Sequence, residues 1–218
     1  MRIRSRAGAR EEEVSPPLNV YALSDAPPPV EVRGAQGEAV RALPAGSLFA
    51  LAGEVDQRPD LTADAVRAHD AAVRRLAVAC PALLPVRFGS IADEVDFSER
   101  EAELLEALEL VRDREQMTLR VYGEPEQADR GSGTAYLESL RRSRSIPALD
   151  PLRAALAPLV RAERTEPHEG PLIASVYHLI DRGSAPEYLR ALAGVALAVR
   201  VAPTGPWPAW SFAPEPLR

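Results

Sequence analysis

The order of elements predicted in the second half of the chain restricts the fold more than any other feature. Residue patterns there predict four β-strands, at 116–123, 159–166, 172–181 and 197–203. Helical segments separate the first strand from the second, at 134–145 and 149–157, and a helix after the capping-box pair Ser184 and Glu187 separates the third from the fourth. The order strand, helix, strand, strand, helix, strand is that of the split βαβ, ferredoxin-like unit.

The first half predicts a separate α+β unit. Strand patterns at 18–23, 38–43, 47–55 and 83–92 surround a helical stripe at 62–80, and the spacing of Ser98 and Glu101 indicates a further helix start. We therefore expect an α+β protein of two domains, an N-terminal α+β domain and a C-terminal modified ferredoxin-like domain with an aromatic tail. The expected ranges are a disordered head at 1–17, domains at 18–115 and 116–218, and the tail at 205–218.

Charge and composition exclude several classes of partner. The net charge is -6, and a nucleic-acid partner would need a surplus of clustered cations, so we expect no nucleic acid to bind. The longest apolar run, at 192–199, is far shorter than the roughly 20 residues that span a bilayer, so no membrane span is expected. The single Cys80 suits a reducing compartment, and no apolar stretch follows the basic N-terminus. We expect a cytoplasmic protein.

The residues that could carry catalysis do not form a recognisable constellation. The dipeptide His69-Asp70 would need further metal ligands, and only His168 and His178 remain, both in the other half. We interpret His69 as a histidine on an apolar helical stripe whose ring nitrogens are satisfied internally. Cys80 lies on the same predicted helix, about 16 Å along the axis from His69, so the two cannot pair. We expect no catalytic residue, no metal and no cofactor, and hence no enzyme.

Two short motifs resist such a structural interpretation. In "PALLPVRFGS", Arg87 interrupts an apolar strand, and a buried guanidinium there must either form an internal ion pair, which we favour, or await a partner. In "GPWPAWSF", both tryptophans of the chain lie within six residues of each other and of Phe212. The prolines lower the entropy cost of docking these rings. We favour docking on the chain itself, across the domain junction, over docking on a partner.

These two motifs, in this order, resemble those of the gas vesicle protein GvpL/GvpF family. The resemblance covers 18–212 and includes "NVYAL", the helix of His69, "GSGTAYLESL" and "ASVYHLID". Ala209 and Trp210 replace the usual proline and tyrosine of the family. The two motifs and the helix of His69 supply the candidate structural or partner-binding residues. They are His69, Pro85, Arg87, Phe88, Gly89, Gly205, Pro206, Trp207, Pro208, Trp210 and Phe212.

The resemblance implies an accessory or minor structural protein of gas vesicle formation, without catalysis. It further implies binding to the shell protein GvpA, to other gas vesicle accessory proteins, or to both, during nucleation and assembly, and association with gas vesicles in the cytoplasm. The alternative from the residues alone is a ferredoxin-like ligand-binding or regulatory module unrelated to gas vesicles. An enzyme would be a third possibility, which a bound metal or cofactor would reveal.

Overall fold

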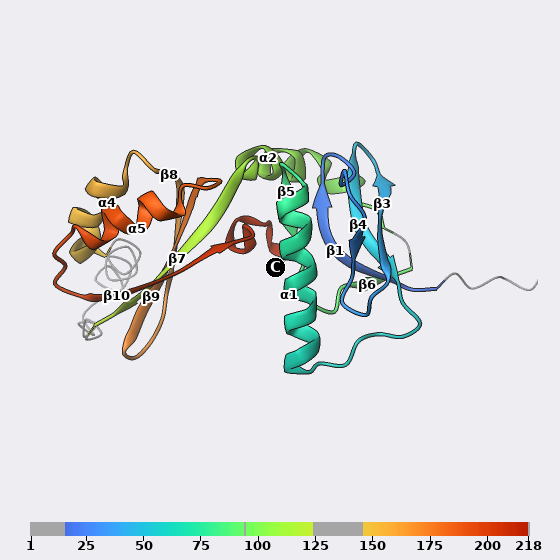
Figure 1. The fold of residues 1–218 in the computed structure, drawn as a ribbon, viewed down its shortest axis with the longest axis horizontal. Helices are drawn as coiled ribbons and strands as arrows, with labels where there is room; N and C mark the ends of the chain where they lie inside the picture. Colours follow the sequence, from blue (N-terminus) through green and yellow to red (C-terminus); the bar gives the residue numbers. More distant parts are fainter. Residues whose placement is uncertain (1–15, 94, 124–145, 218) are drawn as a thin grey trace, which may run out of the picture.

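The chain folds into two antiparallel sheets with helices packed on them, joined by α1, α2 and the C-terminal segment (Figure 1). The computed structural model describes residues 16–93, 95–123 and 146–217. The expected disordered head, up to residue 15, and the expected helix at 134–145 lie outside these ranges. We call the first sheet with α1 and α2 the N-terminal lobe, and the second sheet with α4 and α5 the C-terminal lobe.

The N-terminal sheet has the strand order β2-β3-β4-β1-β5, and β6 also pairs with β1. Its elements are β1 (Leu18–Ser24), β2 (Val32–Arg33), β3 (Ala39–Ala45), β4 (Leu48–Glu54), β5 (Leu83–Pro85) and β6 (Ile91–Ala92). The hairpin expected from the sequence is present as β3 and β4. Gly46 connects these strands with a positive φ of 69°, a backbone conformation that glycine adopts without steric cost.

Two helices complete the N-terminal lobe. Helix α1 (Ala63–Ala79) begins where predicted, because the Thr62 hydroxyl accepts a hydrogen bond from the Ala65 N–H at 3.1 Å. It buries His69 and Leu76 against the sheet, and in Figure 1 it stands between the two sheets. Helix α2 (Glu101–Val111) follows a 3-10 turn at Ser98–Arg100. The capping box expected of Ser98 and Glu101 is wrong, since the Glu101 side chain accepts from the Ser47 N–H instead. The box expected of Ser184 and Glu187 is wrong as well, because the Ser184 side chain makes no cap hydrogen bond.

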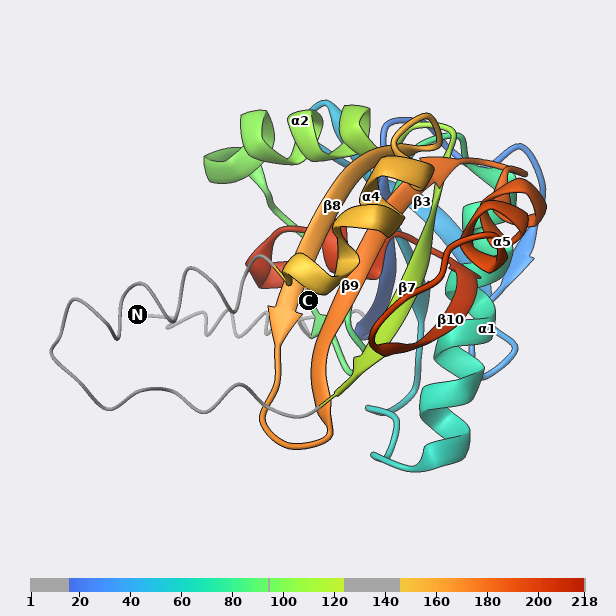
Figure 2. The same cartoon turned by 90° about the vertical axis from the view of Figure 1, so that its left-hand side faces the viewer.

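The C-terminal sheet has the order β10-β7-β9-β8, with all neighbours antiparallel. Its elements are β7 (Arg114–Tyr122), β8 (Val160–Pro167), β9 (Leu172–Asp181), β10 (Arg200–Trp207), α4 (Asp150–Leu156) and α5 (Ala185–Ala193), with a 3-10 turn at Pro147–Leu149 before α4. Figure 2 shows α4 in front of β8 and β9, with α5 to the side near β10. The apolar faces of the helices and strands form one buried cluster that includes Leu119, Leu156 and Tyr188.

A second buried cluster crosses from one lobe to the other. It joins the N-terminal sheet and α2 to Leu179 of β9 and to the last residues of the chain. We call residues 208–217 the closing segment; it contains two 3-10 turns, Trp210–Phe212 and Glu215–Leu217. This cluster makes the closing segment part of the interior of the protein.

Two strand predictions need correction. The stretch predicted as one buried strand, 83–92, is two short strands that both pair with β1, because the chain turns at Gly89, whose φ is +82°. The sequence pattern predicts the last strand at 197–203, whereas the strand begins at Arg200 and continues to Trp207. It tolerates its prolines because it lies at the sheet edge, where fewer backbone N–H groups are needed for pairing.

Candidate functional site: the junction at His69

His69 of α1 holds the segment that follows β5. Its side chain is 2% exposed, and its Nε2 lies 2.9 Å from the carbonyl oxygen of Val86. A carbonyl only accepts hydrogen bonds, so Nε2 carries the proton and donates it to this bond. The bond fixes the first motif against α1.

Three aromatic rings surround the imidazole of His69. The ring of Tyr21, from β1, stacks on it with a centroid distance of 5.0 Å. Phe88 approaches edge-on at 5.7 Å, and Trp210 lies tilted at 6.3 Å. Phe88 belongs to the first motif and Trp210 to the second, so the two motifs meet at one side chain. We call His69, Tyr21, Val86, Phe88 and Trp210 the His69 junction.

The electrostatics of the junction favour a neutral imidazole. Burial lowers the pKa of His69, because the low-polarity surroundings penalise the charged form. Its Nδ1 is buried and has no hydrogen-bond partner among the described residues, so the expectation that both ring nitrogens are satisfied is wrong. The group is therefore suited to hold segments together by packing and one hydrogen bond, and it is shielded from exchanging protons with solvent.

Tyr21 is held in place by hydrogen bonds on both sides of its hydroxyl. The hydroxyl donates to Glu38 and accepts from Asn19 Nδ2 at 2.8 Å and from the Ala35 N–H at 2.7 Å. One donation and two acceptances use the full capacity of a phenol. Burial raises the pKa of Tyr21, so the phenol stays protonated. The ring that stacks on His69 is thus fixed by the N-terminal lobe itself.

The closing segment is anchored in both lobes. Phe212 is 1% exposed within the cluster that joins the lobes. The Arg87 N–H donates to the Leu217 carbonyl at 2.7 Å, which ties the segment to the first motif. The Ser211 N–H donates to Gln116 Oε1 at 2.8 Å, and its carbonyl accepts from Arg164 at 2.7 Å, which ties it to β7 and β8.

The start of the second motif lies in β10 rather than in the closing segment. Gly205 has a φ of +127°, and a Cβ there would lie 2.8 Å from the Gln116 carbonyl oxygen, so only glycine fits. Pro206 is exposed at the same irregularity in the pairing with β7. Trp207 is partly exposed, and the guanidinium of Arg74 lies 4.1 Å from its ring centroid, a cation–π contact between the lobes. Pro208 then enters the interior.

The remaining residues of the first motif differ from their expected roles. Pro85 is buried in β5, and Gly89 makes the turn described above. Arg87 is exposed, so the prediction of a buried guanidinium is wrong. The strand ends at Pro85, and this change of direction turns the Arg87 side chain outward while its backbone N–H serves the closing segment.

Sequence reasoning missed a second buried polar cluster, in the C-terminal lobe. His178 is 2% exposed, with Nε2 3.0 Å from Glu163 Oε2 and Nδ1 2.7 Å from the Tyr188 hydroxyl. Arg153 pairs with the other side of Glu163 at 2.9 Å. The hydrogen bond from His178, with help from Arg153, lowers the pKa of Glu163 to about 2. The only local signal of this cluster in the sequence was a histidine in the strand pattern of β9. The other members of the cluster, Glu163, Arg153 and Tyr188, lie on β8, α4 and α5.

The other candidate sites considered from the sequence are the lone cysteine, a metal site and a membrane span. Burial raises the pKa of the Cys80 thiol, which therefore stays protonated. Within the part of the chain that the structure describes, no three His, Cys, Asp or Glu residues gather as a metal site would require. In the same part, no helix combines the length and apolar character needed to cross a bilayer.

Comparisons with known proteins agree with the resemblance carried by the two motifs. The family model described as "Gas vesicle synthesis protein GvpL/GvpF" matches residues 18–214. Gas vesicle protein L of Streptomyces sp. (strain CB03234) is 29% identical over an alignment of 245 positions, and the alignment covers 89% of this chain and 91% of that protein.

Solved structures share the fold. The crystal structure of GvpF from Anabaena sp. PCC7120 matches with a TM-score of 0.68 at 16% identity, over 92% of this chain and 97% of that one. GvpF from Microcystis aeruginosa matches with a TM-score of 0.68 at 13% identity, over 91% and 99%. At these identities the likeness shows a common mixed α/β fold built on antiparallel sheets.

The family match spans both lobes and reaches past the residues that meet at His69. Because the family model matches residues 18–214, the chain is a gas vesicle protein. It belongs to the GvpL/GvpF family.

Proposed function

We propose that this protein is an accessory or minor structural protein of gas vesicle formation, which binds the shell protein GvpA, other accessory proteins, or both during nucleation and assembly. The observation that carries the proposal is the family match over residues 18–214, which includes both motifs of the His69 junction. The protein would accordingly be found with gas vesicles. Its contribution to assembly would be binding rather than catalysis.

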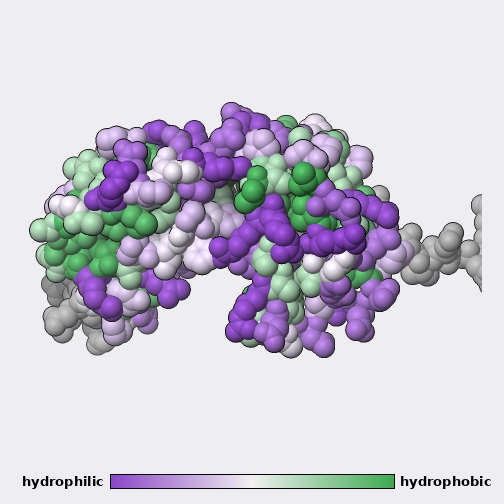
Figure 3. Space-filling model, in the orientation of Figure 1, coloured by the Kyte–Doolittle hydropathy of each residue, from purple (hydrophilic) through white to green (hydrophobic). Residues whose placement is uncertain are grey.

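A shell protein that faces a gas space needs help before it assembles. Its gas-facing surface is apolar, and such a surface aggregates in water. An acidic, water-compatible partner could cover that surface or pair with a strand. Figure 3 shows a largely hydrophilic face, on which apolar residues gather mainly over the C-terminal lobe. This surface is consistent with a partner that stays dispersed while it holds an apolar protein.

The edges of the C-terminal sheet argue against binding by strand addition. The outer strand β8 carries alternating charges, including Arg161 and Glu166, and the opposite outer strand β10 contains Pro203 and Pro206. Charges and prolines at sheet edges prevent a further strand from pairing. We therefore favour contact through side chains over contact through a sheet edge.

We also propose that the two lobes are domains, and that the C-terminal one is ferredoxin-like. The sheet order, in which the first and third strands of the lobe, β7 and β9, form the central pair, supports this assignment. We further propose that the motif residues act mainly inside the chain, as the tie between the two domains. The burial of Pro208 and Phe212 supports a structural role, whereas the partial exposure of Trp207 leaves that ring accessible to a partner.

Co-expression with GvpA tests the proposed function. The tagged full-length chain is expected to recover GvpA in a pull-down, because the two proteins associate before the shell closes. An unrelated acidic protein with the same tag, expressed at the same level, is the control. No recovery of GvpA above this control, under conditions where GvpA stays in solution, would contradict the proposed binding of GvpA.

A further inference from the structure

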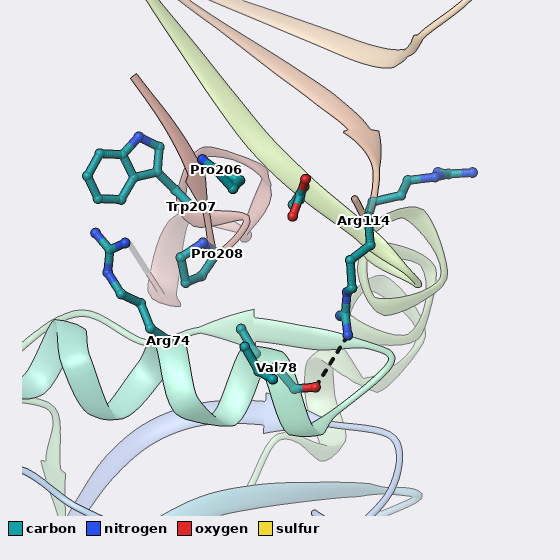
Figure 4. Close-up of a pocket in the computed structure, with 9 residues that line it drawn as sticks. Arg74, Val78, Arg114, Pro206, Trp207 and Pro208 are labelled. Atoms are coloured by element: carbon teal, nitrogen blue, oxygen red, sulfur yellow. Dashed lines mark hydrogen bonds between the residues drawn. The ribbon is translucent and has the colours of Figure 1, made fainter. Parts of the chain in front are cut away.

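A groove between the lobes lies next to the His69 junction. It encloses about 380 Å³ between the last turns of α1, the start of β7 and the end of β10. Figure 4 shows Trp207 and Pro208 on one side, Val78 of α1 on another, and Arg114 of β7 across the space. We call this space the interlobe groove.

The groove combines an apolar floor with a cationic rim. Val78 is 81% exposed although it is aliphatic, and it lines the groove together with Pro206, Trp207 and Pro208. Three guanidinium groups, those of Arg74, Arg114 and Arg182, line the same space with one carboxylate, Glu115. This local excess of positive charge stands on a chain whose net charge is -6.

The charges of the rim are only partly neutralised within the chain. Arg182 donates to the main-chain carbonyls of Val78 at 3.5 Å and Cys80 at 3.0 Å, which orient it without cancelling its charge. Arg114 donates to the Leu110 carbonyl at 2.6 Å, and the carboxylate of Asp181 lies 4.0 Å away. That carboxylate is already paired with another arginine at 2.5 Å. Arg74 is paired with Asp70 at 2.7 Å, so Arg114 and Arg182 are the guanidiniums that are held in place and remain able to attract an anion.

We propose that the interlobe groove binds an acidic segment of a partner protein, with an aliphatic side chain seated on Val78 and Pro208 and flanking carboxylates on Arg114 and Arg182. The inference rests on the proposed function, because it names the chemistry of the partner segment that such an assembly protein would hold. Two features select this occupant: the floor matches an aliphatic group, and the rim matches carboxylates. The proline-rich strand beside the groove disfavours a partner that binds as an added strand.

The charge at position 78 provides a direct test. Val78→Glu places a carboxylate in the groove and should weaken binding of an acidic peptide about tenfold, which corresponds to about 1.4 kcal/mol. Val78→Arg also introduces a long side chain but of opposite charge, and this variant should bind the peptide at least as tightly as the wild type does. Leu61→Glu is the matched control, since Leu61 is 85% exposed and lies just before the other end of α1. Equal melting temperatures of all four proteins would show that the fold is unchanged.

The probe is a short fluorescent peptide of alternating Glu and Leu residues, measured by fluorescence anisotropy against the full-length protein. Its counterpart with Lys in place of Glu is the negative probe. Binding of the Glu peptide that weakens with salt and with Val78→Glu, but not with Leu61→Glu, supports the groove. Equal binding of both peptides, or an equal effect of the Val78→Glu and Leu61→Glu changes, overturns it.

The pull-down with GvpA separates this inference from the proposed function. Recovery of GvpA by the wild type, together with no effect of Val78→Glu on the Glu peptide, overturns the groove and leaves the proposed function in place. Failure of the wild type to recover GvpA overturns the proposed function. The peptide measurements still decide whether the groove binds acidic segments.

Discussion

Replacing Phe212 with alanine tests whether the closing segment stabilises the whole fold. The ring is 1% exposed and packs in the cluster that joins the two lobes. Loss of a buried phenylalanine ring costs about 3–5 kcal/mol, since both the apolar contacts and the filled volume disappear. For a chain of this length we expect a fall in Tm of about 6–20 °C.

Urea unfolding, followed by circular dichroism, measures this cost, and Trp207→Ala is the control. Trp207 is partly exposed, and its contact with Arg74 contributes about 0.5–1 kcal/mol, so its loss should cost well under half as much as that of Phe212. The reasoning fails if Phe212→Ala lowers the unfolding free energy by less than about 1 kcal/mol. Equal costs for the two variants would contradict the distinction between the buried and the exposed aromatic residue.

Truncation after Trp207 removes the closing segment and leaves β10 whole, and it is expected to lower Tm at least as much as Phe212→Ala; an unchanged Tm would refute the anchor. Because burial lowers the pKa of His69, its contribution to stability is fully present above about pH 6.5 and is lost as the pH drops below that value. His69→Phe should therefore make the unfolding free energy depend less on pH between about pH 7 and 5. An unchanged slope would contradict a neutral, buried His69. The pKa of Glu163 is about 2, so its contribution to stability is present above its ordinary pKa of 4.5 and is lost as the pH falls toward 2. Glu163→Gln should therefore lower the unfolding free energy by about 2–3 kcal/mol at pH 7 and by almost nothing near pH 2. An equal cost at both pH values would refute the pairing with His178. Gly205→Ala should cost about 1–3 kcal/mol in the same assay, since its Cβ would meet a carbonyl oxygen, and a neutral result would show that the strand relaxes.

The elements that follow from local patterns were predictable from the sequence. Helix α1 has an apolar stripe, an N-cap at Thr62 and a proline after its end, and it lies where these signals place it. The hairpin of β3 and β4 has regular strand patterns and a glycine turn. Each of these signals acts within a few residues, so the chain needs no distant contact to form them.

The details that depend on distant contacts were not predictable. Glu101 has the spacing of a capping box, but its carboxylate accepts from the Ser47 N–H, which the fold brings close. Similarly, β10 contains prolines that argue against a strand, and only its position at the sheet edge explains why they are tolerated. A local pattern cannot indicate whether a strand will be central or at an edge.

The candidate site shows the same division. His69 and the two motifs could each be singled out from the sequence, because a histidine on an apolar stripe and clustered aromatic residues are unusual. Their meeting could not be deduced, since Phe88 and Trp210 are far apart along the chain and converge only through the packing of the lobes. Val78 of the interlobe groove gave no signal at all, because an exposed valine at the end of a helix is ordinary.

The central proposal is that this member of the GvpL/GvpF family takes part in gas vesicle formation. Electron microscopy of a strain that lacks only the gene for this protein tests it most directly, with re-expression of the wild-type chain from a plasmid as the control. We predict that the deletion strain loses intact gas vesicles and that the plasmid restores them. Vesicles of normal number and shape in the deletion strain would contradict the claim.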